Sequence, residues 1–303
     1  MADFSFPDFR AVYNYAPKYQ IQHLKFALRT LFHRRQIRAF ERFVNSSAAY
    51  QHFFTALPQD AYPLLHTYID KRFRAADRLK HMSADLATAK AAFGEDIFSR
   101  LNLRENSIAL SPLSDGLILC LNRNTNCMDE GWWAVSLRND DNRILYSATF
   151  AFIDGRIIIA SVQGPAGAEA KDQVRRLTKQ LHGLRPQNLM TVALQYLAAA
   201  LTGTHAAGIA HDHQVKLRWR LKKRVQMNYD SFWQEAGGTL QSDGYWHLPE
   251  QPARKPLTEI ESKKRSMYRK RYEMLDILAE NIRQRFAANI RPSENRPLAN
   301  SAD

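Results

Sequence analysis

Apolar residues recur at helical spacing through the first third of the chain. In residues 23–32 and 64–73, Leu, Phe and Ile side chains stand three and four positions apart, which places them on one side of a helix. The pattern continues from about residue 21 to residue 94. It predicts a helical N-terminal block within residues 1–100.

The pattern changes to short β-rich runs between residues 116 and 163. Polar turns separate four such runs, which predict four consecutive strands at residues 117–121, 132–137, 144–153 and 157–162. Asp154-Gly155 is typical of a two-residue hairpin, and residues 139–142 form a looser turn. Consecutive strands should therefore be antiparallel.

Helices and a returning strand follow the fourth strand. We expect helices at about residues 169–181 and 186–201, then a fifth strand at 206–211. Because this strand returns after helices, it should lie parallel to the fourth. The remaining expected elements are a short helix at 229–238, β segments at 238–241 and 245–248, and a long basic helix at 258–288.

The sequence thus predicts an α+β protein with a mixed, mostly antiparallel sheet flanked by helices. We expect a helical N-terminal block over residues 1–100, the sheet domain over 101–250, and a basic C-terminal helix over 251–290 packed on that domain. A Pro/Ser/Asn-rich tail over 291–303 should be disordered.

Composition narrows the class of protein. The 303 residues include 43 basic and 30 acidic residues, a net charge of +13, with 45% hydrophobic residues. These values exclude wholesale disorder and disulfide scaffolds. Residues 1–100 carry a net +6, residues 101–214 are neutral and residues 215–303 carry +7. The excess favours docking onto an acidic protein, such as an acyl carrier protein, or an anionic lipid surface. Nucleic acid is not expected, because no recognition helix, zinc module or RNA-binding motif is present.

Targeting signals are absent from the sequence pattern. We find no secretory signal peptide and no apolar run long enough to span a bilayer. Cys120 and Cys127 are too few and too far apart for a redox or zinc motif, and we expect them to be small apolar fillers on neighbouring strands. A cytoplasmic protein is expected, with peripheral association at the inner membrane as the second possibility.

The order of elements resembles the general-control N-acetyltransferase (GNAT) superfamily. That resemblance implies binding of acyl-coenzyme A or an acyl carrier thioester where strands four and five separate. The turn Gln163-Gly-Pro-Ala-Gly-Ala168 stands where that family has Gln/Arg-x-x-Gly-x-Gly/Ala. It differs in that the glycine comes one residue late and Pro165 lacks an N–H. Gln163, Gly164 and Gly167 are therefore candidate cofactor contacts, and an ordinary strand-to-helix connection is the alternative.

Several separated blocks resemble the bacterial VirK/YbjX family. These blocks are Val162-Gln-Gly164, residues 177–186, Tyr229-Asp-Ser-Phe-Trp233 with Gly237-Gly238, Leu248-Pro249 and residues 261–272. The resemblance implies a role in cell-envelope and lipid A changes, virulence and resistance to antimicrobial peptides. It brings no reaction with it.

His211-Asp-His213 carries the strongest catalytic candidates. On a strand, both imidazoles would share one face and serve as a base or as metal ligands. A metal would need a third ligand from His182, His205 or His247, so we expect no metal site. His211 is the candidate base because it lies nearer the predicted strand end, and Tyr229, or alternatively Tyr245, is the candidate acid for a leaving thiolate. A structural or solvent-facing role is the alternative for each.

Basic residues outside the sheet are candidate anion contacts. His182 and Arg185 form a second loop that could bind a cofactor phosphate. Residues 215–222 alternate apolar and basic side chains, which predicts a strand with one cationic face. The C-terminal helix supplies the candidate partner-binding residues, which are Lys263, Lys264, Arg265, Arg269 and Arg271. A solvated helical face is the alternative.

Two functional hypotheses follow from these patterns. The first is an acyltransferase that uses an acyl-coenzyme A or acyl-carrier thioester in envelope modification. The second is a non-enzymatic adaptor that binds an anionic surface or acidic client through the basic C-terminal helix.

Overall fold

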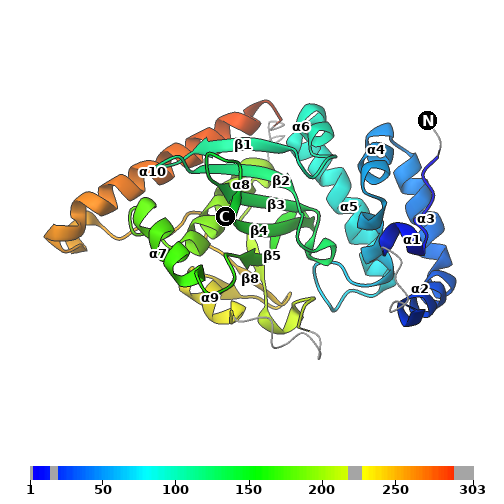
Figure 1. Ribbon diagram of the computed structural model, residues 1–303. Coiled ribbons are helices and arrows are strands. Elements are labelled where there is room, and N and C mark those ends of the chain that lie inside the picture. The colour runs from blue at the N-terminus through cyan, green and yellow to red at the C-terminus, as the bar shows by residue number, and fades with distance from the viewer. Residues whose placement is uncertain (1–2, 14–19, 218–226, 290–303) are drawn as a thin grey trace, which may run out of the picture.

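The computed structural model describes residues 3–13, 20–217 and 227–289. It is an α+β structure in which a group of N-terminal helices stands at one end of a mixed sheet, and later helices pack against that sheet (Figure 1). This arrangement confirms the fold class that the sequence predicts.

The N-terminal block is helical, as predicted. Its elements are α1 (Phe9–Val12), α2 (Gln20–Phe32), α3 (Arg34–Asn45), α4 (Ala48–Ala56), a 3-10 helix (Pro58–Leu65), α5 (Ala75–Phe93) and α6 (Glu95–Arg100). Phe53 is fully buried and contacts both Phe54 and Trp133, with ring centroids 5.0 and 5.5 Å apart. Aromatic packing therefore joins this block to the sheet.

Eight strands of the described chain form one sheet. They are β1 (Ser107–Pro112), β2 (Ile118–Arg123), β3 (Trp133–Arg138), β4 (Ile144–Ile153), β5 (Arg156–Gln163), β6 (Ala207–Ile209), β7 (Thr239–Leu240) and β8 (Tyr245–His247). The spatial order is β1-β2-β3-β4-β5-β6-β8-β7, and β5–β6 is the single parallel pair within the described chain. The predicted antiparallel meander and the parallel fifth strand are confirmed. The edge strand β1, which ends in Pro112, is not among the predicted strands.

The two faces of the sheet differ in chemistry. One face carries large apolar side chains, such as Trp133 and Phe152, which pack against Phe93 of α5. The other face carries small or polar side chains, and we call it the polar face. It includes Asn122, Ser136, Ser147, Thr149 and Ser161, whose positions follow from their strand pairing. These polar residues are buried, so each needs a hydrogen-bond partner.

Four α-helices follow β5 in the described residues. They are α7 (Ala170–Gln180), α8 (Pro186–Thr202), α9 (Tyr229–Glu235) and α10 (Ser262–Phe286). Helix α10 packs on β1 and α8, and Leu278 and Ile282 in its C-terminal half are buried. Phe286 contacts Phe93 of α5, with ring centroids 6.2 Å apart. The N-terminal turns of α10 extend beyond the rest of the molecule (Figure 1). This helix begins at Ser262 because the backbone of Glu261 is non-helical, with ψ 133°, and the preceding Leu257–Glu259 forms a separate 3-10 turn.

Two local predictions need correction. The fifth strand ends at Ile209, and His211–His213 forms a 3-10 turn rather than the end of a strand. Residues 215–217 likewise form no strand, because Gln214 bridges to Asp70 and the chain turns there. Residues 218–222 of that predicted strand lie outside the described chain, as does the predicted tail over 291–303.

The two cysteines do not occupy neighbouring strands, contrary to the prediction from the sequence. Cys120 lies on β2, but Cys127 lies in the loop before β3.

In the described part of the chain, no helix combines the length and apolar character that crossing a bilayer requires.

Candidate active site

The parallel strands β5 and β6 separate after a very short pairing. They pair only through Ile158 with Ala207 and Ile159 with Gly208. Beyond this point the backbone N–H of Val162 donates a hydrogen bond to the Tyr229 hydroxyl at 3.1 Å. A side chain from α9 therefore occupies the position that a strand partner would take.

A bulge in β5 decides which side chains reach the polar face. Phe150 pairs with Ile159, whereas its neighbour Thr149 pairs with Ser161, so Ala160 is an extra residue on β5. Because neighbouring residues of β4 point to opposite faces, Ile159 and Ser161 do too. The bulge thus places Ser161 and then Gln163 on the polar face.

Four polar residues meet at this end of β5, and we call Glu130, Ser161, Gln163 and Lys216 the strand-end cluster. The Glu130 carboxylate accepts hydrogen bonds from Ser161 Oγ and Gln163 Nε2, both at 2.9 Å. Lys216 Nζ lies 3.0 Å from the other oxygen of Glu130. The loop between β2 and β3, which carries Glu130, therefore folds over the polar face.

Burial governs the electrostatics of the cluster. Glu130 is 1% exposed, and this desolvation raises the pKa of its carboxyl. The Lys216 ammonium and the Ser161 hydroxyl oppose that shift because both favour the carboxylate. A buried carboxyl with a raised pKa and a partly exposed cationic partner is typical of proton-transfer sites.

The two predicted catalytic residues lie in contact. The Tyr229 backbone N–H donates to His211 Nδ1 at 3.4 Å, and the His211 backbone N–H donates to Asp230 Oδ1 at 2.9 Å. Burial raises the pKa of the Tyr229 hydroxyl, which is therefore protonated at neutral pH. Since His211 Nδ1 accepts a hydrogen bond, the neutral imidazole carries its proton on Nε2.

A cavity of about 350 Å³ lies beside the end of β5. Gln163 and Gly164 line it together with Asn126, Tyr146 and Ala166. A Cβ atom at position 164 would lie 2.2 Å from the Tyr146 ring, so only glycine fits there without displacement. Gly167, the third residue predicted for this turn, is not among the lining residues. Helix α7 begins only at Ala170.

The second predicted cofactor loop does not join this site. His182 and Arg185 lie beyond the opposite end of α7, whose 11 residues span about 16 Å. The His182 carbonyl accepts hydrogen bonds from Arg271 Nε and Nη2 at 3.0 and 2.9 Å. The guanidinium of Arg271 also lies 4.1 Å from the Tyr268 ring centroid. Arg271 therefore anchors α10 to this loop.

The remaining candidates do not converge on the site. His213 Nδ1 faces the Gly244 carbonyl at 3.2 Å, and His205 contacts His247 at 2.9 Å. No group of His, Cys, Asp and Glu suited to a metal ion occurs among the described residues. The guanidinium of Arg72 lies 5.2 Å from the ring centroid of Tyr245. Because Tyr245 makes this contact away from the site, Tyr229 remains the candidate acid.

The basic residues of α10 divide into two groups. Lys263 and Lys264 are exposed and lie 3.5 and 3.2 Å from Glu261, and Arg269 is exposed. Arg265 instead donates to the Ile260 carbonyl at 2.9 Å, which fixes the start of the helix. Of the five predicted partner-binding residues, Arg265 and Arg271 thus donate to backbone carbonyls of their own chain, whereas Lys263 and Lys264 pair with the exposed Glu261.

Sequence reasoning missed Glu130 as a functional candidate. It comes 31 positions before Ser161, and only the folding of the β2–β3 loop brings them together. Lys216 belongs to the basic segment already noted at 215–222, but the expected strand gave it no specific role. Two acidic residues directly before Gly131 and Trp132 were the available signal.

Comparisons with known proteins place the chain among bacterial relatives. Residues 17–284 match the family described as "Protein of unknown function (DUF535)". An uncharacterised protein of Haemophilus influenzae is 38% identical over 246 residues, covering 80% of this chain and 82% of that protein. Membrane protein LapB of Mannheimia haemolytica is 32% identical over 199 residues, 65% of this chain and 87% of LapB.

The uncharacterised protein YbjX of Escherichia coli is 30% identical over 164 residues, which cover 52% of this chain and 50% of YbjX. This similarity bears out the resemblance to YbjX that the sequence blocks indicate. No solved structure matches the chain significantly.

Proposed function

The chain belongs to the DUF535 family of proteins of unknown function, and we propose from its own site that it is an acyltransferase of cell-envelope modification. The proposed reaction moves an acyl group from a coenzyme A or acyl-carrier thioester to an amine or hydroxyl acceptor. The observation that carries it is the separation of β5 and β6, where the Val162 N–H donates to the Tyr229 hydroxyl.

The strand arrangement supports this reading. A parallel pair that separates after two residues, within an otherwise antiparallel sheet, is the feature at which the GNAT superfamily binds its acyl donor. Gln163, Gly164 and Ala166 line the cavity at the end of β5, together with Tyr146 and Ser147 of β4, and they are the proposed contacts of the donor. Pro165 has no backbone N–H, so it cannot donate a hydrogen bond to a bound acyl donor.

Tyr229 and Glu130 are the proposed proton donor and acceptor. As the acceptor nitrogen or oxygen bonds to the thioester carbonyl carbon, its proton passes to Glu130. The C–S bond then breaks, and the departing sulfur takes the Tyr229 hydroxyl proton. A raised pKa suits Glu130 to this task, because a general base works best when its pKa is near the working pH.

His211 is proposed as a positioning residue. Its Nδ1 lone pair is engaged by the Tyr229 N–H, and its Nε2 then carries the proton, so it is poorly placed to accept another. Through this contact and that of its own N–H with Asp230, His211 holds the start of α9 against β6.

A panel of acyl-coenzyme A and acyl carrier protein donors tests the proposal through thiol release and mass change of amine acceptors. Glu130→Gln and Tyr229→Phe should each lower the rate about 100-fold or more. Tyr268→Phe, a matched change on α10, should leave it unchanged. His211→Ala should lower the rate less and shift the pH profile little. Absence of binding to every donor, or a wild-type rate in the Glu130→Gln/Tyr229→Phe double variant, would overturn the proposal.

The biological setting is proposed from the VirK/YbjX resemblance. A relative named as a membrane protein, LapB, supports an envelope setting. Deletion of the gene should increase sensitivity to cationic antimicrobial peptides, and the wild-type chain, but not Glu130→Gln, should restore resistance. If both chains restored resistance equally, the envelope role would not depend on acyl transfer.

The projecting end of α10 supports a second candidate function. Lys263, Lys264 and Arg269 are exposed and belong to the first turns of α10, which extend beyond the rest of the molecule (Figure 1). This surface suits a non-enzymatic adaptor that binds an acidic client such as an acyl carrier protein. Replacing these three residues by Glu should then abolish function in cells while Tyr229→Phe is silent. The reverse pattern would exclude the adaptor.

A further inference from the structure

Helix α2 carries an apolar stripe that faces away from the protein. Its members recur three and four positions apart, so they share one side of the helix about 100° wide. They are Ile21, Leu24, Leu28, Leu31 and Phe32, and their exposed fractions run from 45% for Leu28 to 76% for Phe32. Nine large hydrophobic residues are exposed in the described chain, and five of them lie on this one helix.

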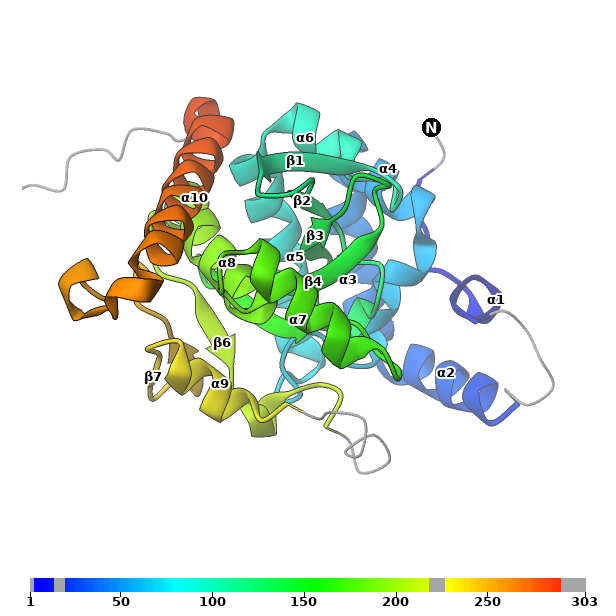
Figure 2. The same ribbon diagram turned by 60° about the vertical axis from the view of Figure 1, so that its left-hand side comes forward.

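The opposite side of α2 makes the contact with the fold. Phe26 is buried, and its ring centroid lies 5.8 Å from those of Phe9 and Tyr62. The exposed stripe is therefore not the face by which the helix packs. Figures 1 and 2 both show α2 at the outer edge of the N-terminal block, where a large surface can approach it. An exposed apolar patch of this kind indicates an interaction site.

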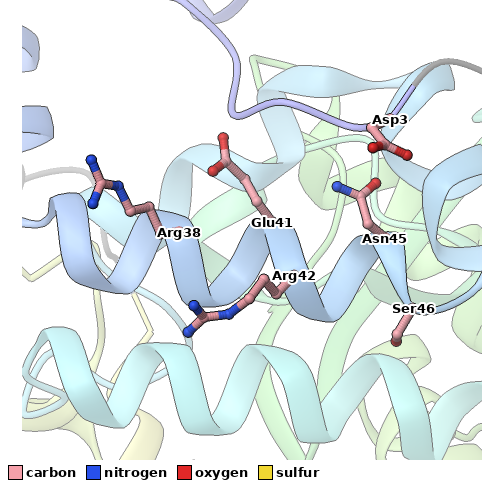
Figure 3. Close-up of a pocket in the computed structure, with 6 residues that line it drawn as sticks. All are labelled: Asp3, Arg38, Glu41, Arg42, Asn45 and Ser46. Carbon is pink, nitrogen blue, oxygen red and sulfur yellow. The ribbon is translucent and has the colours of Figure 1, made fainter.

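The surroundings of the stripe are strongly basic. Residues 20–45 contain six basic residues and one acidic residue, Glu41. Lys25 is exposed on α2, and exposed side chains on α3 continue the charge, namely Arg34, Arg35, Arg38 and Arg42. None of these five has an ion-pair partner among the described residues. Figure 3 shows Arg38 and Arg42 projecting from successive turns of α3.

The single acid of this region is already engaged. Glu41 Oε1 accepts the Phe6 backbone N–H at 2.9 Å, and the neighbouring Asn45 holds Phe4 through two hydrogen bonds. These contacts fasten the N-terminal segment along α3, beside a hollow of about 510 Å³ that Asp3, Arg38 and Glu41 help to line (Figure 3). The positive charges on α2 and α3 are thus left for an external anion.

We propose that α2 lies on an anionic lipid surface, with its apolar stripe among the acyl chains and the arginines of α3 at the headgroups. An amphipathic helix with an apolar side and basic flanks binds membranes in this way. A second copy of the chain is a poorer occupant, because two such basic surfaces would repel each other. The surface is distinct from α10, and the inference does not depend on acyl transfer.

Sedimentation of the full chain with vesicles tests the proposal. Vesicles of phosphatidylcholine with an equal amount of phosphatidylglycerol should bind the protein, and phosphatidylcholine alone should bind it far less. Leu24→Glu/Leu28→Glu and, separately, Arg34→Glu/Arg35→Glu should each weaken binding about tenfold or more. Ile277→Glu, at an apolar residue of α10 that is 53% exposed, is the matched control and should bind as wild type.

Three results would overturn the proposal. One is no binding of wild-type protein to the anionic vesicles. Another is binding that persists in Leu24→Glu/Leu28→Glu but disappears in Lys263→Glu/Lys264→Glu, which would assign it to α10. The third is a wild-type dimer that Leu24→Glu/Leu28→Glu converts to a monomer, which would make the stripe a self-interface. Thiol release from soluble donors should be unchanged in Leu24→Glu/Leu28→Glu. A loss of vesicle binding can therefore be distinguished from a loss of acyl transfer.

Discussion

The ammonium group of Lys216 lies 3.0 Å from the buried carboxylate of Glu130 and joins the segment after β6 to the loop before β3. The two residues differ in exposure, since the Lys216 side chain is 35% exposed and that of Glu130 is 2%. The pair therefore holds one buried charge with a partner at the surface. Removing the partner leaves that charge uncompensated.

We predict that Lys216→Met raises the pKa of Glu130 further. Because the folded pKa of Glu130 is already above its unfolded value, the folded state binds the extra proton, and stability falls as pH rises from about 4.5 through the folded pKa. The variant should lose about 1–3 kcal/mol at pH 8 and less at pH 5, as measured by urea unfolding. Lys264→Met on α10 is the control. An equal loss at both pH values would show that the pair does not set the Glu130 charge.

Asp85 predicts a second pH effect on stability. It accepts hydrogen bonds from the Tyr68 hydroxyl, from Trp133 Nε1 at 3.1 Å and from the Phe152 N–H at 2.6 Å. Complete burial outweighs these donors and raises the pKa of Asp85 to about 7. Between about pH 4 and pH 7 the folded state alone holds the proton, so this residue lowers stability as pH rises through that window.

Asp85→Asn tests this assignment because asparagine cannot ionise. Its melting temperature should vary less between pH 5 and pH 8 than that of the wild type, although the lost acceptor lowers it overall. Asp212→Asn, a change at an exposed residue, should keep the wild-type slope. Parallel pH curves for Asp85→Asn and wild type would contradict the raised pKa.

The buried pair of Arg123 and Asp60 predicts a large effect on folding. Arg123 Nε donates to Asp60 Oδ2 at 2.9 Å, and the guanidinium carbon lies 3.5 Å from the Phe53 ring centroid. Arg123→Met should cost about 3–5 kcal/mol, because it leaves a buried carboxylate without this partner. Adding Asp60→Asn should recover part of the loss in urea unfolding. A single-variant loss below about 1 kcal/mol would show that Arg104, 2.9 Å from Asp60, suffices alone.

Gly164→Ala should disturb the cavity beside β5. The added methyl group would meet the Tyr146 ring at 2.2 Å, and we expect a loss of about 1–3 kcal/mol from this overpacking together with slower thiol release. Tyr146→Leu in the same chain should relieve the clash, so a double-mutant cycle should show strong coupling. Additive effects of the two changes would argue against this contact.

Local patterns accounted for most of the sheet. The Asp154-Gly155 turn was predictable because both residues need positive φ, and they have +46° and +76°. The parallel strand was predictable because it returns after helices. The edge strand β1 was not, because its pairing with β2 is interrupted by a bulge between Ala109 and Ser111 and its covering by α10 is non-local.

The candidate site was predictable only in part. The His-Asp-His pattern led to His211, and the GNAT resemblance led to Tyr229, which does lie in contact with it, and to Gln163 and Gly164, which line the cavity. Glu130 could not be found, since its role depends on a loop folding over a face of the sheet. The exposure of the stripe on α2 could not be predicted either, because the spacing of apolar residues is the same in a helix whose apolar face is buried and in one whose apolar face is exposed.

The extra residue Ala160 makes β5 sensitive to length rather than to residue type. Exchanging Ala160 for another small residue leaves Ser161 and Gln163 on their present face. Deleting it would turn both side chains toward the apolar face of the sheet and away from Glu130. Among related chains, spacing between Ile159 and Ser161 should therefore distinguish those that retain the strand-end cluster from those that keep only the fold.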